Sequence, residues 1–190
     1  MSFRFNYFRK VLFFILAYFL IVIPVFSKEI DSDIKGWSTK VIDNKLIQLS
    51  VHGQVVNGDI FSIFLRKEDC EFGRAQSYLY TIRGDERIKQ NLENKFIYAT
   101  FMGDKVRLKI SYVMPFLAKS HVAVIDMGVV KLDEIEKILL SKSEITISYD
   151  SLEGANIEQY FDIRKNVWST QNLSQSFKEA KSICKKMARK

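Results

Sequence analysis

The sequence predicts a mainly β protein of the α+β class: an antiparallel β-sandwich or open barrel closed by a C-terminal amphipathic helix. Short apolar or alternating segments follow one another with only short turns between most of them, which is typical of antiparallel strands. The last apolar segment instead has the spacing of a helix face. A length of 190 residues suits one domain, and 47% hydrophobic residues are too many for a disordered chain.

Two hairpins are the clearest elements. Residues 46–52 alternate apolar and polar side chains, the Asn57-Gly58 pair is typical of a tight turn, and residues 60–65 return as a nearly continuous apolar strand. Residues 96–102 then lead through Gly103-Asp104 into residues 106–112. Strict alternation in this last strand predicts a shared core face, made up of Val106, Leu108, Ile110 and Tyr112.

The remaining elements complete one domain. Further strands are predicted at residues 37–42, 77–82, 121–125, 144–149 and 160–163, and at 129–131 after a turn at 126–128. The polar stretch 84–94 is expected to form a surface loop with a helical turn. A helix over 132–140 would direct Leu132, Ile135, Ile138 and Leu139 to one side. A last helix would direct inward an apolar stripe formed by Leu173, Phe177, Ala180, Ile183, Cys184 and Met187.

The first residues have the pattern of an export signal. Three basic residues, Arg4, Arg9 and Lys10, precede an uncharged apolar run from Val11 to Phe26, which is shorter than the about 20 residues of a membrane-spanning helix. We therefore expect residues 1–27 to be a signal peptide and residues 28–190 to form a single exported β-rich domain, periplasmic or secreted, of a bacterial protein. The alternative is that residues 1–27 stay as an inner-membrane anchor.

Positive charge gathers at the two ends of the chain. The net charge is +7, but the region between the leader and the final helix is close to neutral. A basic stripe across the body, typical of nucleic-acid binders, is missing, so no nucleic-acid partner is expected. The basic tail could assist lipid contact if the leader is retained; it contains Lys178, Lys181, Lys185, Lys186, Arg189 and Lys190.

The sequence has two cysteines, Cys70 and Cys184. In an exported chain they predict one structural disulfide that would hold the last helix to a strand end. The other interpretation is that Cys184 is a small buried apolar residue.

Motifs for catalysis or cofactor binding are missing. His52 and His121 stand far apart and outside any metal-binding spacing, and both are expected at the surface. No phosphate-binding loop, nucleophile elbow or facing carboxylate pair stands out. The sequence therefore predicts no enzyme, cofactor or metal, although a hydrolase assembled from distant residues stays an alternative.

Several short segments, in order, carry a family resemblance. They are Gly36-Trp37, Met114-Pro115-Phe116, Phe161-Asp162-Ile163 and the segment from Asn172 to Ala180. This order resembles that of small periplasmic β-sandwich proteins of alphaproteobacteria, the invasion-associated locus B group. The resemblance implies a non-catalytic envelope or secreted protein, and it supplies no catalytic residues.

The expected role is binding or structural, in the cell envelope, with an envelope or secreted partner that the sequence does not name. A binding site is expected where exposed aromatic side chains meet the loops 66–74 and 84–94, since loops on a rigid sheet commonly carry binding groups. The oligomeric state stays undefined by the sequence.

Overall fold

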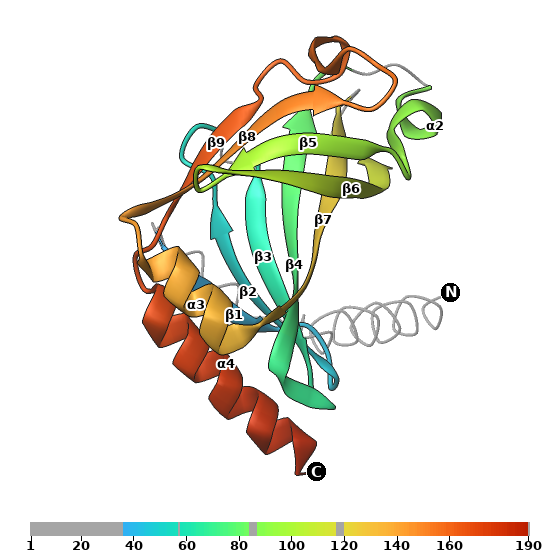
Figure 1. Cartoon of the computed structure of the whole chain (residues 1–190). Coiled ribbons are helices and arrows are strands. Elements are labelled where there is room, and N and C mark those ends of the chain that lie inside the picture. Colours follow the sequence, from blue (N-terminus) through green and yellow to red (C-terminus); the bar gives the residue numbers. More distant parts are fainter. Residues whose placement is uncertain (1–35, 57, 84–86, 117–119, 190) are drawn as a thin grey trace, which may run out of the picture. The chain divides into compact units, whose positions relative to one another are not determined.

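The computed structural model describes residues 36–56, 58–83, 87–116 and 120–189. Residues 34–190 form one compact unit. The unit contains a single nine-stranded sheet, two longer helices and two short ones (Figure 1). The strands are β1 (Ser38–Val41), β2 (Leu46–His52), β3 (Ile60–Arg66), β4 (Asp69–Thr81), β5 (Phe96–Phe101), β6 (Asp104–Pro115), β7 (His121–Lys131), β8 (Glu144–Leu152) and β9 (Lys165–Ser169). The helices are α2 (Ile88–Leu92), α3 (Leu132–Leu140), η1 (Ile157–Gln159) and α4 (Leu173–Ala188).

Every strand pair in the sheet is antiparallel, and the strand order is β1-β2-β3-β4-β7-β6-β5-β8-β9. The mainly β, antiparallel prediction is therefore confirmed, and the sheet is a curled open barrel (Figure 1). Both predicted strand pairs are present as β2–β3 and β5–β6, but the tight turn predicted at Asn57-Gly58 is wrong, because the longer segment 53–59 connects His52 to its partner Ile60. The second pair turns through Met102 and Gly103, which both have positive φ, as a two-residue hairpin loop requires. Asn57 lies outside the described residues.

Strand β9 bends back toward the first two strands of the sheet. Gly53, just after β2, forms an isolated bridge with Trp168, and the Gln54 amide donates to the Val167 carbonyl at 2.8 Å. The Trp37 amide donates to the Gln171 carbonyl, and its indole Nε1 to the Ser169 carbonyl, both at 2.9 Å. These bonds close the barrel at one end without a continuous strand pair between β9 and β1.

The core lies inside the curled sheet and contains a chain of aromatic rings. Phe61 on β3 contacts Trp37 at 5.7 Å between ring centroids, Trp168 at 5.9 Å and Phe101 at 6.3 Å. Phe177 of α4 lies 6.3 Å from Trp37 and so joins the helix to this cluster. The wide rings fill a barrel interior that small side chains would leave partly empty.

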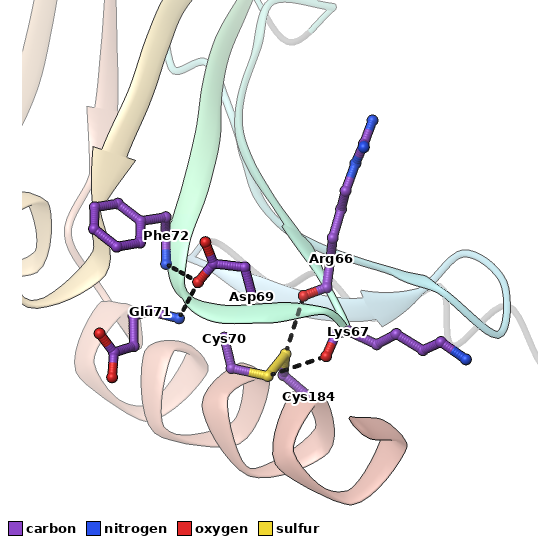
Figure 2. The surroundings of a disulfide bond; sticks show 7 residues. All are labelled: Arg66, Lys67, Asp69, Cys70, Glu71, Phe72 and Cys184. Carbon is purple, nitrogen blue, oxygen red and sulfur yellow. Dashed lines mark hydrogen bonds between the residues drawn. A yellow bond between two sulfur atoms is a disulfide. The ribbon is translucent and has the colours of Figure 1, made fainter. Parts of the chain in front are cut away.

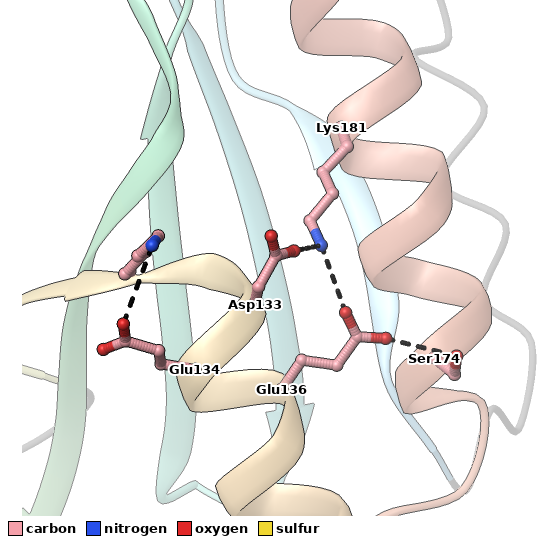
Figure 3. A network of polar contacts seen from close by, with 6 residues as sticks. Asp133, Glu134, Glu136, Ser174 and Lys181 are labelled. Atoms are coloured by element: carbon pink, nitrogen blue, oxygen red, sulfur yellow. Dashed lines mark hydrogen bonds and ion pairs between the residues drawn. The ribbon is translucent and has the colours of Figure 1, made fainter.

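Helix α4 packs against the strands β1 to β4, and α3 packs beside it (Figure 1). The apolar stripe of α4 points inward as predicted, with Leu173, Phe177, Ala180 and Cys184 buried. Figure 3 shows how the two helices are held together: Lys181 of α4 donates to Asp133 at 2.6 Å and to Glu136 at 3.1 Å. Among the described residues, no helix is long and apolar enough to cross a membrane.

Two strand predictions are wrong. Residues 160–163 are not a strand: the 3-10 helix η1 precedes them, and the edge strand is β9, which begins at Lys165. Residues 126–128 do not turn the chain, because β7 continues through them to Lys131. They form a β-bulge opposite Ala75 and Gln76, and Gly128 supplies the positive φ of the bulge.

Two core predictions also need correction. Tyr112 was expected inside, but its side chain is 48% exposed and Val113 is buried instead. The register of β6 against β7 shifts between Ile110 and Tyr112, so a single extra residue reverses the face of everything after it. In α3, Ile138 is 48% exposed, because the buried stripe follows Leu132, Ile135 and Leu139.

Candidate functional site

A pocket lies on the outer face of the sheet, beside the β3–β4 hairpin. Its volume is about 510 Å³, within the range of small-molecule sites. Four strands contribute to it, because register brings Phe64 of β3 opposite Arg74 of β4 and Arg74 opposite Val129 of β7. We call it the hairpin pocket; it is lined by Leu46, Phe64, Arg66, Asp69, Phe72, Gly73, Arg74, Gln76 and Val129.

The apolar part of the hairpin pocket is unusually open to solvent. Phe72 is 40% exposed and Val129 is 69% exposed, while Leu46 and Phe64 are half-buried. Single exposed apolar residues are common on protein surfaces, but here four of them gather in one concave place. A ligand seated there would remove this apolar surface from water.

Two of the three charged groups in the hairpin pocket are already engaged. Arg74 donates from Nε to Asp126 at 3.0 Å and forms a second bond through Nη2 to the same carboxylate. This hydrogen-bonded pairing raises the pKa of Arg74. Asp69 accepts the amides of Glu71 and Phe72 at 3.1 and 3.3 Å, which fixes the start of β4. Among the described residues, Arg66 forms no ion pair.

The predicted disulfide between Cys70 and Cys184 is present directly behind this hairpin, with the two Cα atoms 5.7 Å apart. Figure 2 shows both sulfur atoms next to the backbone of the turn. Cys184 Sγ lies 3.4 Å from the Arg66 carbonyl oxygen, and Cys70 Sγ lies 3.8 Å from that of Lys67. The disulfide therefore has a structural role: it attaches to helix α4 the stretch of backbone that includes Arg66.

A second polar cluster surrounds Asp59, before β3. Its carboxylate is buried, accepts the Tyr80 amide at 2.7 Å and accepts Asn166 Nδ2 at 2.9 Å. Asn166 also donates to the Val56 carbonyl and accepts the Val55 amide. Burial raises the pKa of Asp59 to about 6, against the opposite effect of its two hydrogen bonds. The cluster ties the β2–β3 loop to β9, and its residues are not among those that line the hairpin pocket.

The two histidines lie on different strands. His52 ends β2 and is exposed, opposite Ile60. His121 begins β7 and is half-buried, opposite Thr81 and Pro115. Thr81, the hydroxyl residue beside it in register, donates to the Tyr160 carbonyl. Within the described parts of the chain, no three acidic, histidine or cysteine side chains gather as a metal site would require.

The sequence located half of the candidate site. Residues 66–74 do lie at the hairpin pocket, with one exposed aromatic residue, Phe72. The described part of the second loop, 87–94, holds α2 and lies at the other end of β4 (Figure 1). Phe64, Leu46 and Val129 were not predicted. A signal for Phe64 existed: in a continuous apolar strand, alternate residues must face outward.

Comparison of the chain with protein-family models, with curated proteins and with solved structures finds no match.

Proposed function

We propose that this chain is an exported bacterial protein, periplasmic or secreted, that acts by binding rather than by catalysis, with the hairpin pocket as its binding site. The observation that carries the proposal is the disulfide between Cys70 and Cys184 behind the pocket. Disulfides persist in the periplasm and outside the cell, whereas cytosolic thiols are kept reduced.

The leader supports the same compartment independently. Arg4, Arg9 and Lys10 precede the apolar run from Val11 to Phe26, and the first acidic residue after it is Glu29. This order of charge favours export of the residues that follow. Val25 and Ser27 stand at the −3 and −1 positions of a cleavage after Ser27.

Binding is favoured over catalysis by the composition of the hairpin pocket. Its described lining includes two arginines, an aspartate and a glutamine, but no hydroxyl, thiol or imidazole group, and its one carboxylate, Asp69, accepts two backbone amides of the turn. The Arg74 and Asp69 side chains stabilise the strands around the pocket. The site offers a ligand apolar area, the Arg66 cation and the polar side chain of Gln76.

Intact mass measurement of the native protein, together with cell fractionation, tests the proposal. We expect a chain that begins at Lys28, lacks free thiols and leaves the cytosol. Ser27→Tyr is the matched variant: a bulky residue at −1 should block cleavage and keep the chain in the membrane fraction. A native chain with an intact Met1 in the membrane would favour the anchored alternative. A cytosolic chain with two free thiols would overturn the proposal.

A further inference from the structure

We propose that the hairpin pocket binds an anionic amphiphile, a molecule with an alkyl or aryl body and one carboxylate. The apolar body would lie on Phe64, Phe72 and Val129, and the anionic group would contact Arg66. This inference rests on the proposed function of the pocket as a binding site, and it adds the chemical class of the ligand.

The apolar surface that would contact the ligand comes from three strands. Phe64 and Phe72 come from the two strands of one hairpin, and Val129 comes from the strand on the other side of β4. Together they offer a curved apolar surface in which Phe72 and Val129 are well exposed. Covering such a surface is favourable in proportion to the apolar area removed from water, so a ligand with a flexible alkyl chain or an aromatic ring fits it.

Of the two arginines in the hairpin pocket, Arg66 is the one available to an anionic ligand. The Arg74 guanidinium is already neutralised by Asp126. Asp69 lies opposite Arg66 in register but forms no ion pair with it, and its Oδ1 accepts two backbone amides of the turn. Figure 2 shows the Arg66 side chain extending away from Asp69. A guanidinium without an ion-pair partner in the described chain is suited to a carboxylate, which it can bind through two parallel bonds.

The disulfide holds in place the backbone from which the Arg66 side chain extends. The Arg66 carbonyl oxygen is in contact with Cys184 Sγ, so the backbone from which the side chain extends is held to α4. Fixing the backbone lowers the entropy that binding would otherwise have to remove.

Isothermal titration of the native chain with decanoate tests the inference, and decanol is the matched uncharged probe. We expect decanoate to bind roughly 10-fold more tightly than decanol, the contribution of one charge-assisted pair. Each methylene removed from the carboxylate should weaken binding roughly 3-fold to 4-fold. Arg66→Gln should abolish the preference for decanoate, and Phe72→Ser should weaken both probes. Lys95→Gln, which removes an exposed cation just before β5, is the control and should change neither.

Equal affinity for decanoate and decanol, or an Arg66→Gln variant that keeps the preference, would overturn the inference. So would Arg66-dependent sedimentation with phosphatidylglycerol vesicles in the absence of decanoate binding, because the cation would then serve a lipid surface. These results are separate from the test of export: a cytosolic chain that binds decanoate removes the proposed compartment only, and an exported chain that ignores decanoate removes the ligand class only.

Discussion

Cys184 Sγ lies 3.4 Å from the carbonyl oxygen of Arg66, so the covalent link to α4 and a cation of the hairpin pocket that forms no ion pair among the described residues meet at the same turn. Residue 66 is where β3 ends and where the register against β4 shifts, from Leu65 opposite Gly73 to Arg66 opposite Asp69. A hairpin with such an irregular end needs support from outside the sheet, and the disulfide supplies it.

Removing the disulfide should therefore destabilise the chain strongly. The bond joins residues 114 apart in sequence, and on the chain-entropy model a loop of that length contributes about 4–5 kcal/mol. The Cys70→Ala/Cys184→Ala double variant should lower the free energy of unfolding in urea by that order. Adding reductant to the wild type should reproduce the loss, and adding it to the variant should change nothing. A variant as stable as the oxidised wild type would contradict the structural role of the bond.

The Asp59 carboxylate predicts an unusual pH dependence. Burial raises its pKa from 3.8 to about 6 in the folded state, so the folded chain holds this proton more tightly than the unfolded chain does. Stability from this group is full below pH 4 and is lost as the pH rises through 6, by about 3 kcal/mol in total. The stability of the wild type relative to Asp59→Asn should therefore increase when the pH is lowered from 7 to 4.5.

The control for Asp59 is Asp104→Asn, an exposed aspartate at the start of β6. Its stability relative to the wild type should stay nearly constant over the same pH range. If the Asp59→Asn difference is equally flat, or decreases as the pH falls, the raised pKa of the buried carboxylate is wrong.

Two glycines of the β2–β3 loop should differ in how much stability the same substitution costs. A Cβ on Gly53 would lie 2.3 Å from Asn166 Nδ2 and 2.5 Å from the Val56 carbonyl oxygen, inside the contacts that hold β9. Gly53→Ala should cost about 1–3 kcal/mol, as crowding of a packed interior does. The three atoms nearest to a Cβ on Gly58 all belong to the Tyr80 side chain, at 3.6 Å or more, which is ordinary van der Waals contact.

Thermal unfolding of the two glycine variants makes the comparison. Gly58→Ala should stay within about 0.5 kcal/mol of the wild type, the usual range for a surface substitution without crowding. Similar losses in both variants would show that the approach of β9 to Gly53 is looser than the structure has it.

Lys181 should contribute more to the stability of the folded chain than the other lysines of its helix do. Burial lowers the pKa of Lys181, but its hydrogen bonds to Asp133 and Glu136 outweigh that effect and raise it (Figure 3). Its side chain is 25% exposed, so the pairs are less screened than pairs on an open surface. Lys181→Met should destabilise the chain by about 0.5–1 kcal/mol in low salt, and by less in 1 M salt.

Lys178→Met is the matched variant for Lys181, one turn earlier on α4 and exposed. Chemical denaturation at both salt concentrations should find it close to the wild type. A Lys178 variant as unstable as the Lys181 variant would assign the effect to helix propensity or hydrophobicity rather than to the carboxylates of α3.

Local pattern was sufficient for most of the strands and for the stripe of α4. Alternation of residues 106–110 and the spacing of Leu173, Phe177, Ala180 and Cys184 reflect which side chains meet the core, and that information is local. Prediction from local pattern failed at Tyr112 and at residues 126–128. In both places a bulge inserts one residue, and the presence of a bulge depends on the neighbouring strand. Strand β9 was missed because its five residues have little apolar signal apart from Val167 and Trp168.

The candidate site was harder to predict than the fold. Arg66 and Phe72 are close in sequence, so a loop argument could find them. Leu46 and Val129 reach the same pocket only through the order of four strands in the sheet, and no local pattern encodes that order. The disulfide was the exception, since two cysteines allow only one intramolecular pairing.

The return of β9 to the opening strands has a consequence for how the chain acquires its structure. Trp37 is bonded to a carbonyl 132 residues further along the chain, and residues 165–188 supply both the seal of the barrel and the helix behind it. A ribosome or a translocon that has released only the preceding strands holds a sheet with its interior uncovered. Contacts so distant in sequence favour slow folding, and the barrel can close only after the last segments of the chain are available.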